Sequence, residues 1–69
     1  MTREEFQNET ADFSGTKQEA LALLATFEER GFWAGCVVEF DDGKCALMLK
    51  TAAALVAGFG MCKIVEVEL

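Results

Sequence analysis

Histidine is absent from this chain of 69 residues, and so are proline and tyrosine. Without histidine the chain has no catalytic triad of the Ser–His–Asp kind, no imidazole general base and no histidine-ligated metal site. Proline commonly marks linkers, so its absence gives no sign of a linker between two domains. We therefore expect a single domain that is not an enzyme and that holds no metal and no cofactor.

Cysteine is sparse and odd in number, with Cys36, Cys45 and Cys62 far apart in the sequence. A secreted disulfide scaffold favours an even and denser set. A zinc site favours four ligands in close pairs. A nucleophilic thiol needs a nearby base or cation, and Lys63 beside Cys62 points to the other face of a strand. We predict three reduced, mostly buried thiols in a cytoplasmic protein.

Basic residues are few: the chain has six Lys and Arg and twelve Asp and Glu, which gives a net charge of −6. Binding to phosphates requires clustered Lys and Arg. We expect no direct contact with nucleic acid or with an anionic membrane, and a preference for a basic protein surface. A charge that serves only solubility is the equally weighted alternative.

The longest hydrophobic stretch covers residues 45–62, and Lys50 is its one charged residue. A membrane-spanning helix needs about 20 apolar residues. Lys50 interrupts the stretch near its start, and Gly58 and Gly60 weaken a helix near its end. Residues 1–5 lack the apolar region of a signal peptide. We expect neither a membrane span nor an export signal.

Two alternating segments flank Asp42-Gly43, which predicts a β-hairpin over residues 34–49. The dipeptide suits a two-residue type I′ turn, because both central residues of that turn need φ > 0. Pairing about this turn places Phe40 opposite Cys45. One face of the hairpin then becomes wholly apolar, with Cys36, Val38, Phe40, Cys45, Leu47 and Leu49.

The clearest helix covers residues 16–31. Thr16 and Glu19 have the spacing of a capping box, and Gly31 suits the left-handed position that ends a helix in a Schellman motif. The core-facing stripe consists of Ala20, Leu23, Leu24 and Phe27. Residues 1–15 are an N-terminal arm or a short helix, and the polar composition fits both.

Two predictions compete for the middle of the chain. Helix-forming residues over 44–57 favour one continuous helix. The Asp-Gly turn opposes that helix and favours the hairpin, followed by a short helix over residues 51–58 that Thr51 caps. Residues 61–69 alternate again and predict a third strand.

These elements predict a small single domain of the α+β class. Its long helix packs on a three-stranded sheet that contains the β-hairpin, and a second short helix joins the hairpin to the last strand. That short helix is apolar all round and needs burial on every side. Either the long helix covers it, or Ala53, Leu55 and Val56 form the interface of a homodimer or larger oligomer.

The candidate partner-binding residues are two aromatics and an acidic group. Aromatics at the ends of elements plug the core or, when exposed, anchor an interface. Acidic side chains around such anchors attract a basic partner and raise its association rate. The predicted set is Trp33, Phe59, Glu39, Asp41, Asp42, Glu66 and Glu68.

In size, acidity and lack of a catalytic set, the chain resembles the small phage-encoded inhibitors of bacterial defence, such as anti-CRISPR proteins. The resemblance concerns overall character and no particular stretch of residues. It implies a non-enzymatic inhibitor in the host cytoplasm, whose acidic residues stand in for phosphates and block a nucleic-acid-handling complex. A homo-oligomeric structural or small-ligand-binding protein is the alternative, and an enzyme with a cysteine nucleophile is a third hypothesis.

Overall fold

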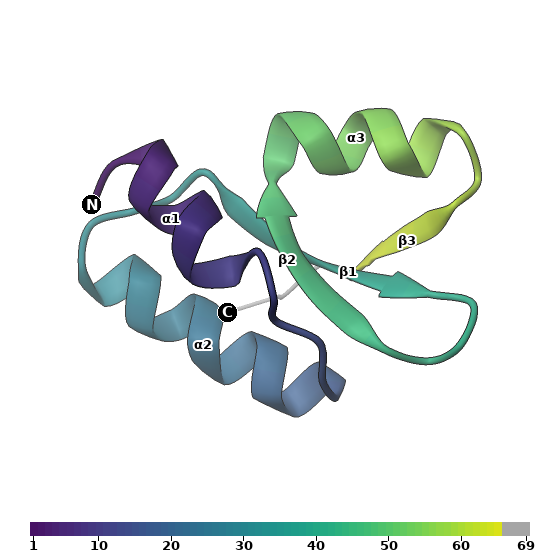
Figure 1. The fold of residues 1–69 in the computed structure, drawn as a ribbon, viewed down its shortest axis with the longest axis horizontal. Helices are drawn as coiled ribbons and strands as arrows, with labels where there is room; N and C mark the ends of the chain where they lie inside the picture. Colours follow the sequence, from purple (N-terminus) through teal and green to yellow (C-terminus); the bar gives the residue numbers. More distant parts are fainter. Residues whose placement is uncertain (66–69) are drawn as a thin grey trace.

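The computed structural model describes residues 1–65. In this part of the chain three strands form one sheet, and three helices cover its two faces. All strands pair antiparallel in the order β2-β1-β3. Helices α1 and α2 cover one face and α3 covers the other (Figure 1). The elements are α1 (Arg3–Thr10), α2 (Lys17–Glu29), β1 (Gly35–Phe40), β2 (Cys45–Leu49), α3 (Lys50–Gly58) and β3 (Cys62–Val65). The predicted α+β class is confirmed.

The N-terminal segment is a helix rather than an arm. Thr2 caps α1, because its Oγ1 accepts the N–H of Glu5 at 3.1 Å. The capping box of α2 is complete: Thr16 Oγ1 accepts the N–H of Glu19, and Glu19 Oε1 accepts the N–H of Thr16, both at 3.2 Å. Both helices therefore begin where a side chain satisfies a free backbone donor.

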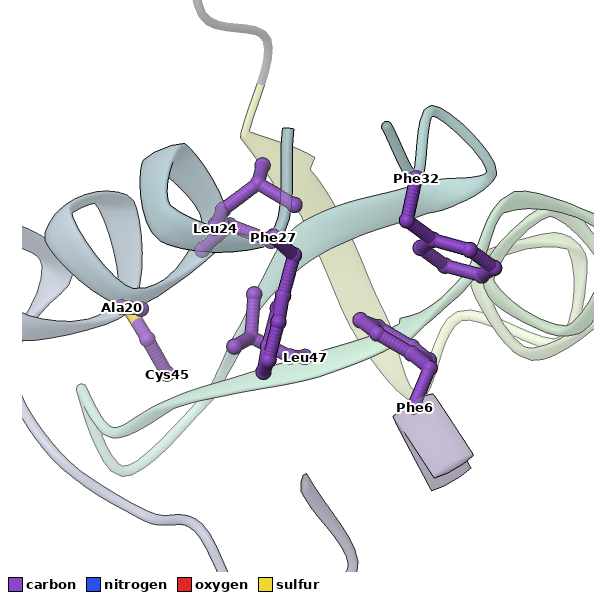
Figure 2. Close-up of a cluster of buried hydrophobic side chains, with 8 residues drawn as sticks. Phe6, Ala20, Leu24, Phe27, Phe32, Cys45 and Leu47 are labelled. Carbon is purple, nitrogen blue, oxygen red and sulfur yellow. The ribbon is translucent and has the colours of Figure 1, made fainter. Parts of the chain in front are cut away.

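Helix α2 ends in the predicted Schellman motif. Gly31 has φ of 86°, its N–H donates to the Glu28 carbonyl at 2.9 Å, and the N–H of Phe32 donates to the Phe27 carbonyl at 3.0 Å. The motif turns Phe32 into the core, where its ring stacks on that of Phe6 at 4.7 Å (Figure 2). An aromatic contact thus joins α1 to the end of α2.

The loop between β1 and β2 differs from the predicted two-residue turn. The N–H of Phe40 donates to the Lys44 carbonyl and the N–H of Gly43 donates to the Phe40 carbonyl, both at 2.9 Å. Gly43 has φ of 84°, whereas Asp42 does not have positive φ. This is a three-residue loop, a type I turn followed by a left-handed glycine.

The additional loop residue shifts the register by one position. Val37 lies opposite Leu47 and Glu39 opposite Cys45, so the predicted pairing of Phe40 with Cys45 is wrong. A slip of one residue exchanges the faces of one strand relative to its partner. The predicted apolar face is therefore split, and its β1 members lie on the side of the sheet away from Leu47: Cys36, Val38 and Phe40.

The hydrophobic pattern of β1 does not distinguish the two registers, because both faces of the strand are buried. Val37 and Val38 are each 0% exposed, yet they point to opposite sides of the sheet. The main core lies on the Val37 side and contains Phe6, Ala20, Leu24, Phe27, Phe32, Val37, Cys45 and Leu47 (Figure 2). On the other side α3 contacts all three strands, and its Ala53 is fully buried.

Helix α3 follows β2 without a loop. The N–H of Lys50 still continues the strand pairing, donating to the Ala34 carbonyl at 2.7 Å. Leu49 is the N-cap and makes no side-chain cap bond, so the predicted cap at Thr51 is wrong. The competing helix over residues 44–57 is also wrong, since β2 occupies its first part.

The third strand is confirmed for β3, which pairs with β1. The remainder of the strand predicted over residues 61–69 includes residues 66–69, which lie outside the described part of the chain. In the described part, no helix combines the length and the apolar character needed to cross a membrane.

Candidate protein-binding surface

Large apolar side chains lie exposed around the junction of α3 and β3. We call the set the α3–β3 patch, and its members are Leu55, Phe59, Met61 and Ile64, with exposed fractions of 64%, 74%, 62% and 38%. Single exposed apolar residues are ordinary on protein surfaces, whereas neighbouring ones mark interaction sites. The patch is therefore the first candidate for a binding surface.

A second Schellman motif builds the patch. Gly60 has φ of 75°, and the N–H of Met61 donates back to the Val56 carbonyl at 3.4 Å. This tight turn brings Met61 beside the last turn of α3. Leu55 and Phe59 are one helical turn apart and so share a side of α3. The apolar residues thus come together from a helix and from the turn that follows it.

An acidic turn lies at the same end of the sheet as the patch. Cys62 pairs with Phe40, so the loop that carries Asp41 and Asp42 lies near the turn between α3 and β3 (Figure 1). Both aspartates are exposed. Asp42 Oδ1 also accepts the N–H of Lys44 at 3.0 Å, which fixes the loop. The structure thus places two predicted acidic residues at the same end of the sheet as the turn that follows the predicted anchor Phe59.

Other predicted residues do not join this surface. Trp33 is 64% exposed, but it precedes β1, and Phe59 lies near the other end of that strand. Glu39 is half-buried on the side of the sheet that α1 and α2 cover, and it pairs with Lys63 across the strands. The predicted partner-binding set therefore divides into separate parts.

The residues predicted for an oligomer interface also have different environments. Ala53 is fully buried within the chain itself and is therefore not available to a second subunit. Leu55 is exposed and Val56 is half-buried. Glu66 and Glu68 lie outside the described residues.

Sequence reasoning missed Met61 and Ile64 as members of the patch. The alternation of residues 61–69 predicted a half-exposed strand without indicating which face would be open. Ile64 lies in β3, at an edge of the sheet, and Met61 lies in the turn before that strand. Gly60 was the available signal, since it marks the turn that brings Met61 back beside α3.

Two of the three thiols are poorly suited to catalysis. Burial raises the pKa of Cys45, and the carboxylate of Glu39 opposite it adds to the effect. Burial also raises the pKa of Cys36, although Lys50 opposes the rise. All three cysteines are free. Cys36 and Cys45 thus stay protonated at neutral pH, and a protonated thiol is a weak nucleophile.

Comparisons of this chain with protein-family models, with curated proteins and with solved structures found no match. The α3–β3 patch and the acidic turn at the same end of the sheet are therefore the features that indicate a function.

Proposed function

We propose that this chain is a non-enzymatic protein-binding module that inhibits a basic, nucleic-acid-handling complex. The α3–β3 patch is its apolar anchor, and Asp41 and Asp42 are its anionic contacts. The observation that supports this proposal is the position of the acidic turn and the patch at the same end of the sheet.

The two features make different contributions to binding. Burying exposed apolar area supplies affinity, at roughly 25 cal/mol per Å², and Phe59 at 74% exposed has the most relative area to lose. Carboxylates at the rim of an interface raise the association rate and select basic partners. The net charge of −6 acts in the same direction over a longer range.

Charge mimicry provides the inhibitory mechanism. Asp41 and Asp42 are consecutive and exposed on a turn that backbone and side-chain hydrogen bonds hold in place. A channel that binds phosphates with Lys and Arg side chains binds such carboxylates by the same charge-assisted hydrogen bonds. The bound module then excludes nucleic acid from that channel.

The first experiment isolates partners from a bacterial lysate at low salt and measures whether the module displaces nucleic acid from them. We expect a basic partner that loses its nucleic acid when the module is added. The double variant Asp41→Asn/Asp42→Asn removes both charges and keeps an acceptor for the Lys44 N–H. Its affinity should fall about 5- to 30-fold at low salt.

The matched control is Glu28→Gln/Glu29→Gln at the end of α2, which changes the net charge equally but away from the turn. It should bind within about twofold of the wild type. Equal losses in the two double variants would mean that only net charge matters. A partner that retains its nucleic acid in the presence of the module would contradict inhibition.

A further inference from the structure

The outer edge of β2 carries backbone groups that face away from β1. Hydrogen-bonded pairs mark both ends of the β1–β2 ladder: Lys50 donates to Ala34 at 2.7 Å, and Phe40 donates to Lys44 at 2.9 Å. Hydrogen-bonded and non-hydrogen-bonded pairs alternate in an antiparallel ladder. Leu47 lies opposite Val37 in a non-hydrogen-bonded pair, so its N–H and C=O point outward.

The hydrogen bonds of Cys45 confirm this alternation, because its N–H and C=O also point outward and both have a partner. Gly15 donates to the Cys45 carbonyl at 3.2 Å, and Cys45 donates to the Gly15 carbonyl at 2.8 Å. Two residues further on, Leu47 is only 5% exposed, and within residues 1–65 no hydrogen bond satisfies its outward N–H or C=O. Main-chain groups of this kind pair either with water or with another polypeptide.

These groups lie in a groove of about 390 Å³ between α1 and the start of α3. Its lining is mostly apolar, and Gln7 and Thr10 supply the polar side chains. The lining residues include Phe6, Gln7, Thr10, Phe13, Met48 and Ala52. The groove thus combines apolar walls with the main-chain pattern of an unfinished sheet.

We propose that this groove binds an extended, apolar segment of another polypeptide, which adds to β2 as a strand opposite Leu47. Main chain in the extended conformation offers an N–H and a C=O at the spacing that Leu47 needs. The single-residue pairing of Gly15 with Cys45 is the same interaction, made by the chain itself. Gly15 also limits the added strand to a short segment.

Exposed acidic residues that adjoin two of the lining residues in the sequence favour a segment with a basic end. Phe13 and Phe40 line the groove, and the exposed carboxylates of Asp12 and Asp41 come directly beside them in the chain. A second folded copy is a poorer occupant, because α1 and Gly15 lie along the edge that its strand would have to reach. A short extended peptide needs only the part of the edge at Leu47, which the pairing of Gly15 with Cys45 leaves open.

Asp41 is the one residue that this site shares with the surface of the proposed inhibitory function. The groove lies at the β2 edge of the sheet, whereas the α3–β3 patch lies at the β3 edge, and β1 separates the two. Variants of the patch therefore leave the groove intact, and failure of either proposal leaves the other standing.

The test uses the whole chain and a capped peptide, acetyl-Lys-Val-Ile-Val-Lys-amide, at about 1 mM. Amide hydrogen exchange is followed by NMR. We expect exchange at Leu47 to slow by about tenfold or more when the peptide binds. The same peptide methylated at its three central amide nitrogens has the same side chains but lacks the donors, and it should give no protection.

A matched pair of variants locates the site. Ala52 lines the groove and Ala54 does not, although both are exposed on α3. Ala52→Trp should weaken peptide binding about tenfold, and Ala54→Trp should leave it unchanged. Unchanged exchange at Leu47, equal binding of the methylated peptide, or equal affinities of the two variants would overturn the proposal. So would protection of Leu47 that depends on protein concentration without peptide, which would indicate a second copy.

Discussion

The aromatic ring of Phe6 lies directly against the backbone of Gly35. A Cβ atom at Gly35 would lie 2.9 Å from both Cε2 and Cζ of Phe6, and 3.2 Å from Cδ1 of Leu24. This close approach lets the ring stack on Phe32 and meet Phe27 edge-on, with centroids 4.7 Å and 5.2 Å away. The attachment of α1 to the sheet therefore depends on the absence of a side chain at the start of β1.

Gly35→Ala should destabilise the fold, because the ring and the new methyl group compete for one space. We expect a loss of about 1–3 kcal/mol in the free energy of unfolding, measured by chemical denaturation. Gly58→Ala is the control, since its Cβ would meet no atom within 4 Å. In a helix this change should gain about 0.5–1 kcal/mol. Equal stabilities of the two variants would contradict the close approach.

The two threonines predicted to cap helices should respond differently to substitution. Thr16 accepts a backbone N–H in the capping box of α2, so Thr16→Ala should cost about 1 kcal/mol. Thr51 lies inside α3 and makes no cap bond, so Thr51→Ala should be neutral or stabilising by up to about 0.7 kcal/mol. Thermal unfolding of both variants measures the difference, and a larger loss at Thr51 would be inconsistent with a helix that begins at Lys50.

The buried thiol of Cys45 should make stability depend on alkaline pH. Its pKa in the folded chain lies above the usual thiol value of 9.0, so the unfolded chain loses the proton first. The contribution is present in full below that value and is lost as the pH rises through the folded pKa. Unfolding free energies measured between about pH 8 and pH 10.5 should fall less steeply for Cys45→Ala than for the wild type. Parallel slopes would argue against the raised pKa.

The hairpin register can be measured directly. Residues opposite each other in a non-hydrogen-bonded pair have Cα atoms about 4.5 Å apart, so their Hα protons give a strong nuclear Overhauser effect. We expect that signal between Val37 and Leu47, and between Glu39 and Cys45. A signal between Val38 and Leu47 would instead support the two-residue turn.

The sequence predicted both ends of α2, but neither the start of α3 nor the hairpin register. Thr16, Glu19 and Gly31 act within their own turns, so their spacing alone determines the caps. Asp42-Gly43 fits both a two-residue and a three-residue loop. The binary pattern did not separate them, because Val37 and Val38 are both apolar and both buried.

Half of the patch was predictable and half was not. Leu55 was notable in the sequence because it lies in a helix with no polar face, and Phe59 because it is an aromatic residue at the end of that helix. Met61 joins them through the turn at Gly60. Ile64 joins them from the edge strand β3, and strand order is a property of the tertiary fold. For the same reason the sequence did not indicate that β1 separates Trp33 from Phe59.

The most direct test of the account asks whether the α3–β3 patch stays open on the free chain, as a surface kept for another protein must. Light scattering should measure the molar mass at two protein concentrations and two salt concentrations. We predict the mass of one chain throughout, with no change in Leu55→Glu or Phe59→Glu. A stable dimer that Leu55→Glu dissociates would contradict this and assign the patch to self-association.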